Sequence, residues 1–142
     1  MSALLGALLV TGFHAAALSR ADVPEPERRD LSLYIDEVHT FATLSLVDIL
    51  QEARKYRLNL ILAHQYLDQL DLRIQQAVLG NVGTLIAFRV GGRDAKVLAE
   101  EFFPEITMED LVSLPPYHIY LRLMIDGVVS QGFSGVTLPP PS

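Results

Sequence analysis

Short apolar runs alternate with helix-like stretches along most of this 142-residue chain. Three of the runs are rich in strand-forming residues: 31–35, 58–63 and 84–90. Two other stretches, 44–57 and 95–102, repeat apolar residues at the spacing of one helical face, and 71–79 is predicted as a helix that Gly80 ends. Strands that alternate with helices are typical of βαβ units, in which the strands run parallel. The order therefore predicts an α/β fold, and ligands of such sheets bind beyond the carboxyl ends of the strands.

The last third of the sequence predicts local structure of a different kind. The pair Asp126-Gly127 separates the segments 117–125 and 128–134, and an Asp-Gly pair between such segments is a strong signal for a β-hairpin. Thr107 and Asp110 have the spacing of a capping box at the start of a short helix.

Composition excludes several classes of function. The chain has no cysteine, which rules out a disulfide scaffold, a thiolate zinc site and a cysteine nucleophile. The formal charge is −6, and a free-standing nucleic-acid binder usually carries the opposite sign. The four histidines, at positions 14, 39, 64 and 118, are scattered without metal-ligand spacing, and we expect His64 to be a partly buried histidine with its hydrogen bonds satisfied.

The N-terminal run at 3–18 is apolar and carries no formal charge when His14 is neutral. It is shorter than the ~20 residues that a membrane-spanning helix needs, and it lacks the basic start of a signal peptide. We expect a helix that is buried on most sides, with a degenerate signal peptide as the alternative.

Acidic and amide side chains follow two neighbouring predicted strands. Asp36 and Glu37 come directly after the run at 31–35, which is the Walker B pattern. The first carboxylate of that pattern can hold a hydrated Mg²⁺ on nucleotide phosphates, and the second can polarise the attacking water. Gln65 follows the next strand and could contact both that water and a γ-phosphate. A purely structural interpretation is also open for these residues: the acids could cap the following helix, and Gln65 could be a loop amide that hydrogen-bonds the backbone.

Three basic residues, Arg54, Lys55 and Arg57, end the helix that precedes the second strand. Cations are favoured at a helix C-terminus, so compensation of the helix dipole is one explanation. The other is an arginine that reaches a nucleotide held by the neighbouring subunit.

Several segments together resemble one family of proteins. The segments are LYIDEVHTFA at 33–42, EARKYRL at 52–58, AHQYLDQL at 63–70, NVGT at 81–84, and FRVG at 88–91 followed by Asp94-Ala95. In this order they resemble the TraG/TraD-like coupling ATPases of type IV secretion and conjugation, in the HerA/FtsK group of RecA-like hexameric motors. The resemblance covers most of residues 1–138 and leaves a Pro-rich tail at 139–142.

The resemblance implies a role for each candidate site residue. Asp36 would assist the binding of Mg²⁺ through water, Glu37 would be the catalytic base, and Gln65 would be the sensor of the γ-phosphate. Arg54 falls where some members place an arginine that acts in trans, and Arg57 is its rival.

The resemblance also implies cofactors, partners and a location. ATP and Mg²⁺ would be the cofactors, and the partners would be further copies of the chain in a hexameric ring, DNA and the proteins of a secretion channel. The location would be cytoplasmic, and full-length members are often anchored to the inner membrane.

One element of these motors is missing. Their P-loop has the pattern G-x-x-x-x-G-K-[ST], but neither of the two lysines here, Lys55 and Lys96, follows a glycine. The resemblance thus implies the C-terminal part of a RecA-like three-layer domain, with a mainly parallel sheet and a C-terminal hairpin but without the P-loop strand or the upstream half. We expect no ATP hydrolysis by this chain alone, and two strand edges that face a gap and favour oligomerisation, rearrangement or a partner.

Two alternatives to a coupling ATPase fragment stay open. The chain could be a non-catalytic interaction or assembly module that uses the same sheet to dock a partner. It could also be a fragment of a HerA-like motor that processes DNA in the cytosol.

Overall fold

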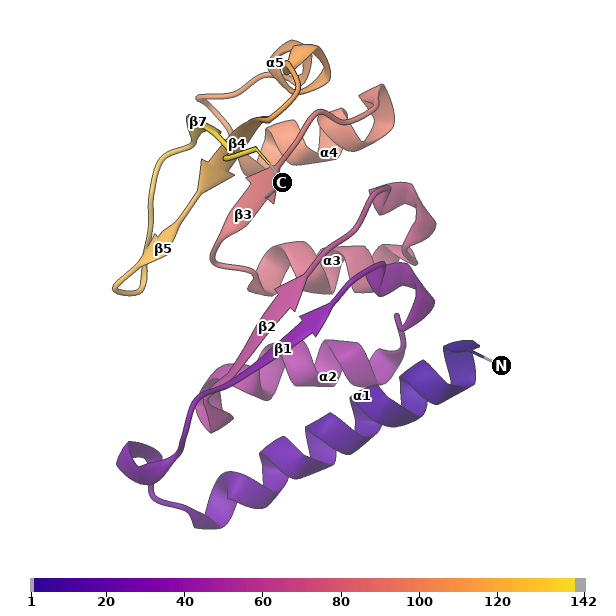
Figure 1. Cartoon of the computed structure of the whole chain (residues 1–142), viewed down its shortest axis with the longest axis vertical. Coiled ribbons are helices and arrows are strands. Elements are labelled where there is room, and N and C mark those ends of the chain that lie inside the picture. Colours follow the sequence, from indigo (N-terminus) through magenta and orange to yellow (C-terminus); the bar gives the residue numbers. More distant parts are fainter. Residues whose placement is uncertain (1, 140–142) are drawn as a thin grey trace. The chain divides into compact units, whose positions relative to one another are not determined.

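The structure, a computed structural model, describes residues 2–139. The chain divides into two compact units between Asn81 and Val82. Figure 1 shows their helices and strands along the sequence.

The first unit contains a parallel pair of strands and three helices. In chain order these are α1 (Ser2–Leu18), β1 (Leu31–Ile35), α2 (Leu44–Glu52), β2 (Leu58–Leu62) and α3 (Leu72–Asn81). Strands β1 and β2 pair in parallel register, from Leu31 opposite Leu58 to Ile35 opposite Leu62. Helix α2 connects the two strands, as parallel pairing requires. The β-α-β unit expected at this place in the sequence is confirmed.

The core of the first unit lies under α2. Leu46 and Ile49 of this helix are almost completely buried, and Ala53 continues the same face one turn later. These three positions follow the predicted helical spacing. The other buried apolar residues of this unit are Val10, Ala17, Ile35, Val38, Leu58, Leu70, Ile74 and Val78.

Helix α1 is much more exposed than its sequence predicts. Leu4, Leu5, Leu8 and Leu9 are each more than half exposed. The buried residues form a single stripe that includes Gly6, where a Cβ would lie 1.9 Å from Cδ1 of Phe41. The expectation of a helix buried on most sides is wrong, because the rest of the unit covers only one face of the helix.

By length and hydropathy, the helical stretch Leu4–Asp22 could cross a membrane, and 17% of it is buried. Core helices of soluble proteins and signal sequences share this length and hydropathy.

The second unit is built on antiparallel strands. It contains β3 (Leu85–Ala87), α4 (Gly92–Glu101), α5 (Met108–Ser113), β4 (His118–Arg122), β5 (Met124–Ile125), β6 (Val128–Val129) and β7 (Phe133–Val136). The strand order is β3-β4-β7, and β5 and β6 form a separate hairpin. The hairpin turns at Asp126 and Gly127, whose φ angles of 49° and 81° are those of the type I′ turn that Asp-Gly favours. The predicted hairpin is confirmed.

The α/β fold class is confirmed, with parallel pairing confined to β1 and β2 and antiparallel pairing in the second unit. Within the described residues, β2 and β3 each pair with another strand along one edge only.

A capping box starts α5, as predicted. Thr107 donates hydrogen bonds from its main-chain N–H and its hydroxyl to the Asp110 carboxylate, both at 2.8 Å, and the N–H of Asp110 donates to the Thr107 hydroxyl at 3.2 Å. The two bonds to the carboxylate, chiefly the one from the main chain, hold the pKa of the Asp110 carboxyl below its ordinary value of 3.8.

We predict that Thr107→Val raises the pKa of Asp110 but leaves it below 3.8, because the main-chain donor remains. The stabilisation from the box should be complete above pH 3.8 and should be lost as the pH falls below that value, since the folded-state pKa is the lower one. NMR titration of the carboxyl measures the pKa. Ser113→Ala in the same helix is the control, and an unchanged pKa in Thr107→Val would contradict the prediction.

Candidate functional site

The predicted site residues Asp36, Glu37 and Gln65 lie at the carboxyl ends of β1 and β2. The ladder between these strands extends past their last paired residues: the N–H of Ala63 donates to the carbonyl of Ile35 at 2.8 Å, and the N–H of Val38 donates to the carbonyl of Ala63 at 3.1 Å. The segments that follow the two strands are therefore held side by side by main-chain bonds.

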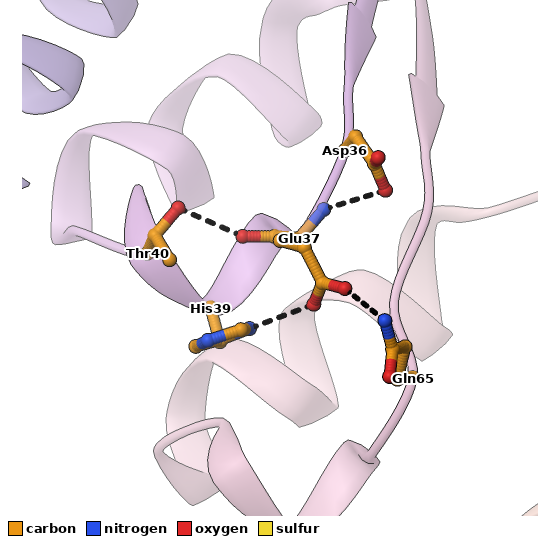
Figure 2. A network of polar contacts seen from close by, with 5 residues as sticks. All are labelled: Asp36, Glu37, His39, Thr40 and Gln65. Atoms are coloured by element: carbon orange, nitrogen blue, oxygen red, sulfur yellow. Dashed lines mark hydrogen bonds and ion pairs between the residues drawn. The ribbon is translucent and has the colours of Figure 1, made fainter.

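The backbone of Glu37 has a left-handed conformation, with φ 49° and ψ 55°. Its N–H donates to Oδ1 of Asp36 at 2.9 Å, and its carbonyl accepts from the Thr40 hydroxyl and the Thr40 N–H, each at 2.9 Å. A residue with a Cβ rarely takes this conformation, and such strain is common at functional sites. The bond that Glu37 donates to Asp36 and the bonds that it accepts from Thr40 hold the backbone from which the Glu37 side chain projects (Figure 2).

Each oxygen of the Glu37 carboxylate has its own partner. The side-chain amide of Gln65 donates to Oε1, and Nδ1 of His39 lies 3.4 Å from Oε2. Figure 2 shows Glu37 between these two side chains. The Glu37 side chain is 35% exposed, so water can reach it. The predicted acid and the predicted amide thus contact each other directly.

Two histidines come together beside this carboxylate, contrary to the expectation from the sequence. The ring centroids of His39 and His64 are 5.4 Å apart, and the planes are tilted by 45°. Glu37, His39 and His64 can each offer one ligand atom within 4.8 Å of the others. Their spacing in the sequence did not reveal this cluster, but both histidines follow the carboxyl ends of strands expected to be neighbours, which was an available signal.

Arg54 lies away from this cluster. It is exposed on the 3₁₀ turn η4 (Ala53–Tyr56), which precedes β2, whereas Gln65 follows β2. A five-residue strand of about 16 Å separates the two ends. The structure therefore does not bring Arg54 to Glu37 of the same chain.

Arg57, the alternative to Arg54 as the arginine that acts in trans, has structural contacts within its own chain. Its φ is 54°, its Nη1 lies 3.7 Å from Oδ1 of Asp30, and its carbonyl accepts from the N–H of Leu31 at 3.0 Å. These contacts tie Arg57 to the start of β1.

Two arginines that the sequence did not single out hold the backbone next to Arg54. Arg28 donates to the carbonyl of Lys55, and Arg20 donates to the carbonyl of Tyr56 at 3.3 Å. The guanidinium of Arg28 also lies 5.6 Å from the centroid of the Tyr56 ring, within the range of a cation–π contact. The turn that carries Arg54 is therefore fixed from the loop that precedes β1.

No protein-family model matches the chain, and no curated protein sequence matches it. Solved structures do match in fold. The bacterial conjugative coupling protein TrwB, lacking its first 70 residues, matches with a TM-score of 0.65 and 17% identity, over 89% of this chain and 35% of that one. VirB4 of Thermoanaerobacter pseudethanolicus matches with a TM-score of 0.67 and 18% identity, over 93% and 37%.

A third match extends the comparison to a virus. The genome packaging NTPase B204 of Sulfolobus turreted icosahedral virus 2, in complex with ATP-γS, has a TM-score of 0.58 and 18% identity, over 82% of this chain and 56% of that one. TrwB has also been solved with ADP and Mg²⁺. The chain therefore shares the α/β fold of part of these proteins. It spans about a third of the length of the TrwB and VirB4 chains.

We predict that Glu37→Gly is more stable than Glu37→Ala by about 1 kcal/mol, because the Cβ of alanine is strained in the left-handed conformation that this position adopts and glycine has no Cβ. Both variants lose the carboxylate, so the difference between their unfolding free energies reports the strain of the backbone alone. Urea unfolding of the full chain measures it.

Asn59, exposed in the middle of β2, is the matched control. Asn59→Ala should be more stable than Asn59→Gly, since glycine in a strand costs about 0.5–1 kcal/mol relative to alanine. A Glu37→Gly variant that is less stable than Glu37→Ala would contradict the strained conformation.

Proposed function

We propose that this chain is part of a TraG/TraD-like coupling ATPase, which uses ATP to move DNA in conjugation or type IV secretion. The observation that carries the proposal is the direct contact of Glu37 with Gln65 at the carboxyl ends of two parallel strands. This position is where an α/β sheet binds its ligand, and the fold is shared with proteins solved in complex with nucleotides.

Each residue of the site has a defined task in this proposal. Glu37 accepts the proton of the attacking water, and its fixed backbone keeps the carboxylate aimed at that water. Gln65 orients the carboxylate and reports whether a γ-phosphate is present. Asp36 is exposed at the strand end and suits a hydrated Mg²⁺, which supplies neutralisation of the phosphate charges when nucleotide is bound.

The chain cannot hold the triphosphate by itself in this proposal, since it has no P-loop sequence. Another segment of the complete protein would supply the P-loop, and the complete domain would work as a hexameric ring with DNA and secretion-channel proteins as partners. Arg54, exposed and remote from Glu37 of its own chain, suits a role at the site of the neighbouring subunit.

The open edges of β2 and β3 favour a second candidate, a non-catalytic assembly module. A strand edge without a partner is a template for another chain. In that case the chain would bind its partner through β2 or β3, and the partner would not gain any ATPase activity.

We predict that the chain joined to its upstream P-loop segment hydrolyses ATP, and that Glu37→Gln lowers kcat by about 10²-fold or more, the usual contribution of a general base. Nucleotide binding should persist, because the substitution removes only the base. Turnover and binding of a fluorescent ATP analogue are the measurements. Glu105→Gln, an exposed acid in the second unit, is the control. Hydrolysis that is absent, or insensitive to Glu37→Gln, favours the assembly module.

We predict that Arg54→Ala in the assembled ring lowers kcat by about 10³-fold, as expected for an arginine finger, while ATP affinity changes little. Lys55→Ala, at the adjacent exposed position, should keep full turnover. Mixing Arg54→Ala with Glu37→Gln subunits tests action in trans, because some interfaces then regain both residues. Equal loss of turnover and binding would indicate damage to the fold instead.

A further inference from the structure

We propose that Glu37, His39 and His64 form a binding site for one Zn²⁺ ion. The three side chains come from the segments that follow β1 and β2, and each can offer a ligand atom within 4.8 Å of the others. The ladder between Ile35, Ala63 and Val38 fixes the two segments against each other. The cluster is therefore built by the fold and not by one flexible loop.

Two distances within the cluster agree with tetrahedral coordination. Ligand bonds of about 2.0–2.1 Å at tetrahedral angles would place two imidazole centroids roughly 5 Å apart, and an imidazole nitrogen about 3.3 Å from a carboxylate oxygen. The centroids of His39 and His64 are 5.4 Å apart, and Nδ1 of His39 is 3.4 Å from Oε2 of Glu37. The ligand atoms of all three side chains lie within 4.8 Å of one another, so binding one ion would draw some of them closer together.

The donor set suits zinc better than magnesium. Two imidazoles and one carboxylate, with a fourth position for water, are the ligands of an open zinc site. Mg²⁺ prefers six oxygen ligands and keeps several of its waters, so it gains little from two histidines. Access is available, because the side chains of His39 and Glu37 are 30% and 35% exposed.

Gln65 adds an outer partner of the kind that metal ligands commonly have. Its amide donates to Oε1 of Glu37, and Oε2 faces His39. An ion could therefore bind Oε2 while Gln65 holds the other oxygen and orients the carboxylate. If Glu37 is the base of a motor, which rests on the proposed function, a bound Zn²⁺ would occupy the carboxylate and block that role.

Zn²⁺ binding to the full chain, without nucleotide, tests the site. Competition with a chromophoric chelator should give one Zn²⁺ per chain, and excess Mg²⁺ should not displace it. His39→Ala, His64→Ala and Glu37→Gln should each weaken binding at least about tenfold, since loss of an outer partner alone typically costs that much. Co²⁺ in place of Zn²⁺ should give the intense visible absorption of a four-coordinate ion.

His118→Ala is the matched control, because His118 lies in the second unit with Nδ1 3.1 Å from the carbonyl of Pro116. It should leave the affinity unchanged. Circular dichroism checks each variant, and His39→Asn and His64→Asn replace any alanine variant that loses helix content. Absence of saturable binding in the wild type, or unchanged affinity in the His39→Asn/His64→Asn double variant, would overturn the site. Neither result bears on ATP hydrolysis, so the two proposals fail separately.

Discussion

Parallel pairing of β1 with β2 is the constraint on which the site depends. Main-chain bonds continue beyond the strands, through Ala63, and hold the segment with Glu37 against the segment with Gln65. A shift of one residue in this register would turn Gln65 away from the carboxylate, because successive side chains of an extended segment point to opposite faces. Two loops that are far apart in the sequence are thus held in a fixed position relative to each other. Both the proposed water activation and the proposed metal site depend on this position.

The sequence predicted well those features that neighbouring residues determine. The strand at 31–35 has the predicted bounds, since its apolar run ends directly at Asp36. The capping box at Thr107 and the turn at Asp126-Gly127 also formed as predicted, because each needs only a few adjacent residues to satisfy local hydrogen bonds or positive φ angles. The α/β class followed from the order of such local signals, and parallel pairing then placed Glu37 near Gln65.

Features that depend on packing between distant segments could not be predicted. Helix α1 is apolar on all sides, so its periodicity gives no indication of which face is buried or how much of it the unit can cover. The approach of His39 to His64 depends on the path of two loops after the strands. Arg20 and Arg28 support η4 mainly through bonds to main-chain carbonyls, which leave no pattern in the sequence.

The close contact between Gly6 and Phe41 links α1 to the site mechanically. No side chain fits at position 6 unless the Phe41 ring moves. The N–H of Phe41 bonds to the carbonyl of Val38, the residue next to Glu37, so displacement of the ring would strain the turn that aims the acid. The path from the N-terminal helix to the turn that carries Glu37 therefore runs through one aromatic ring and one hydrogen bond.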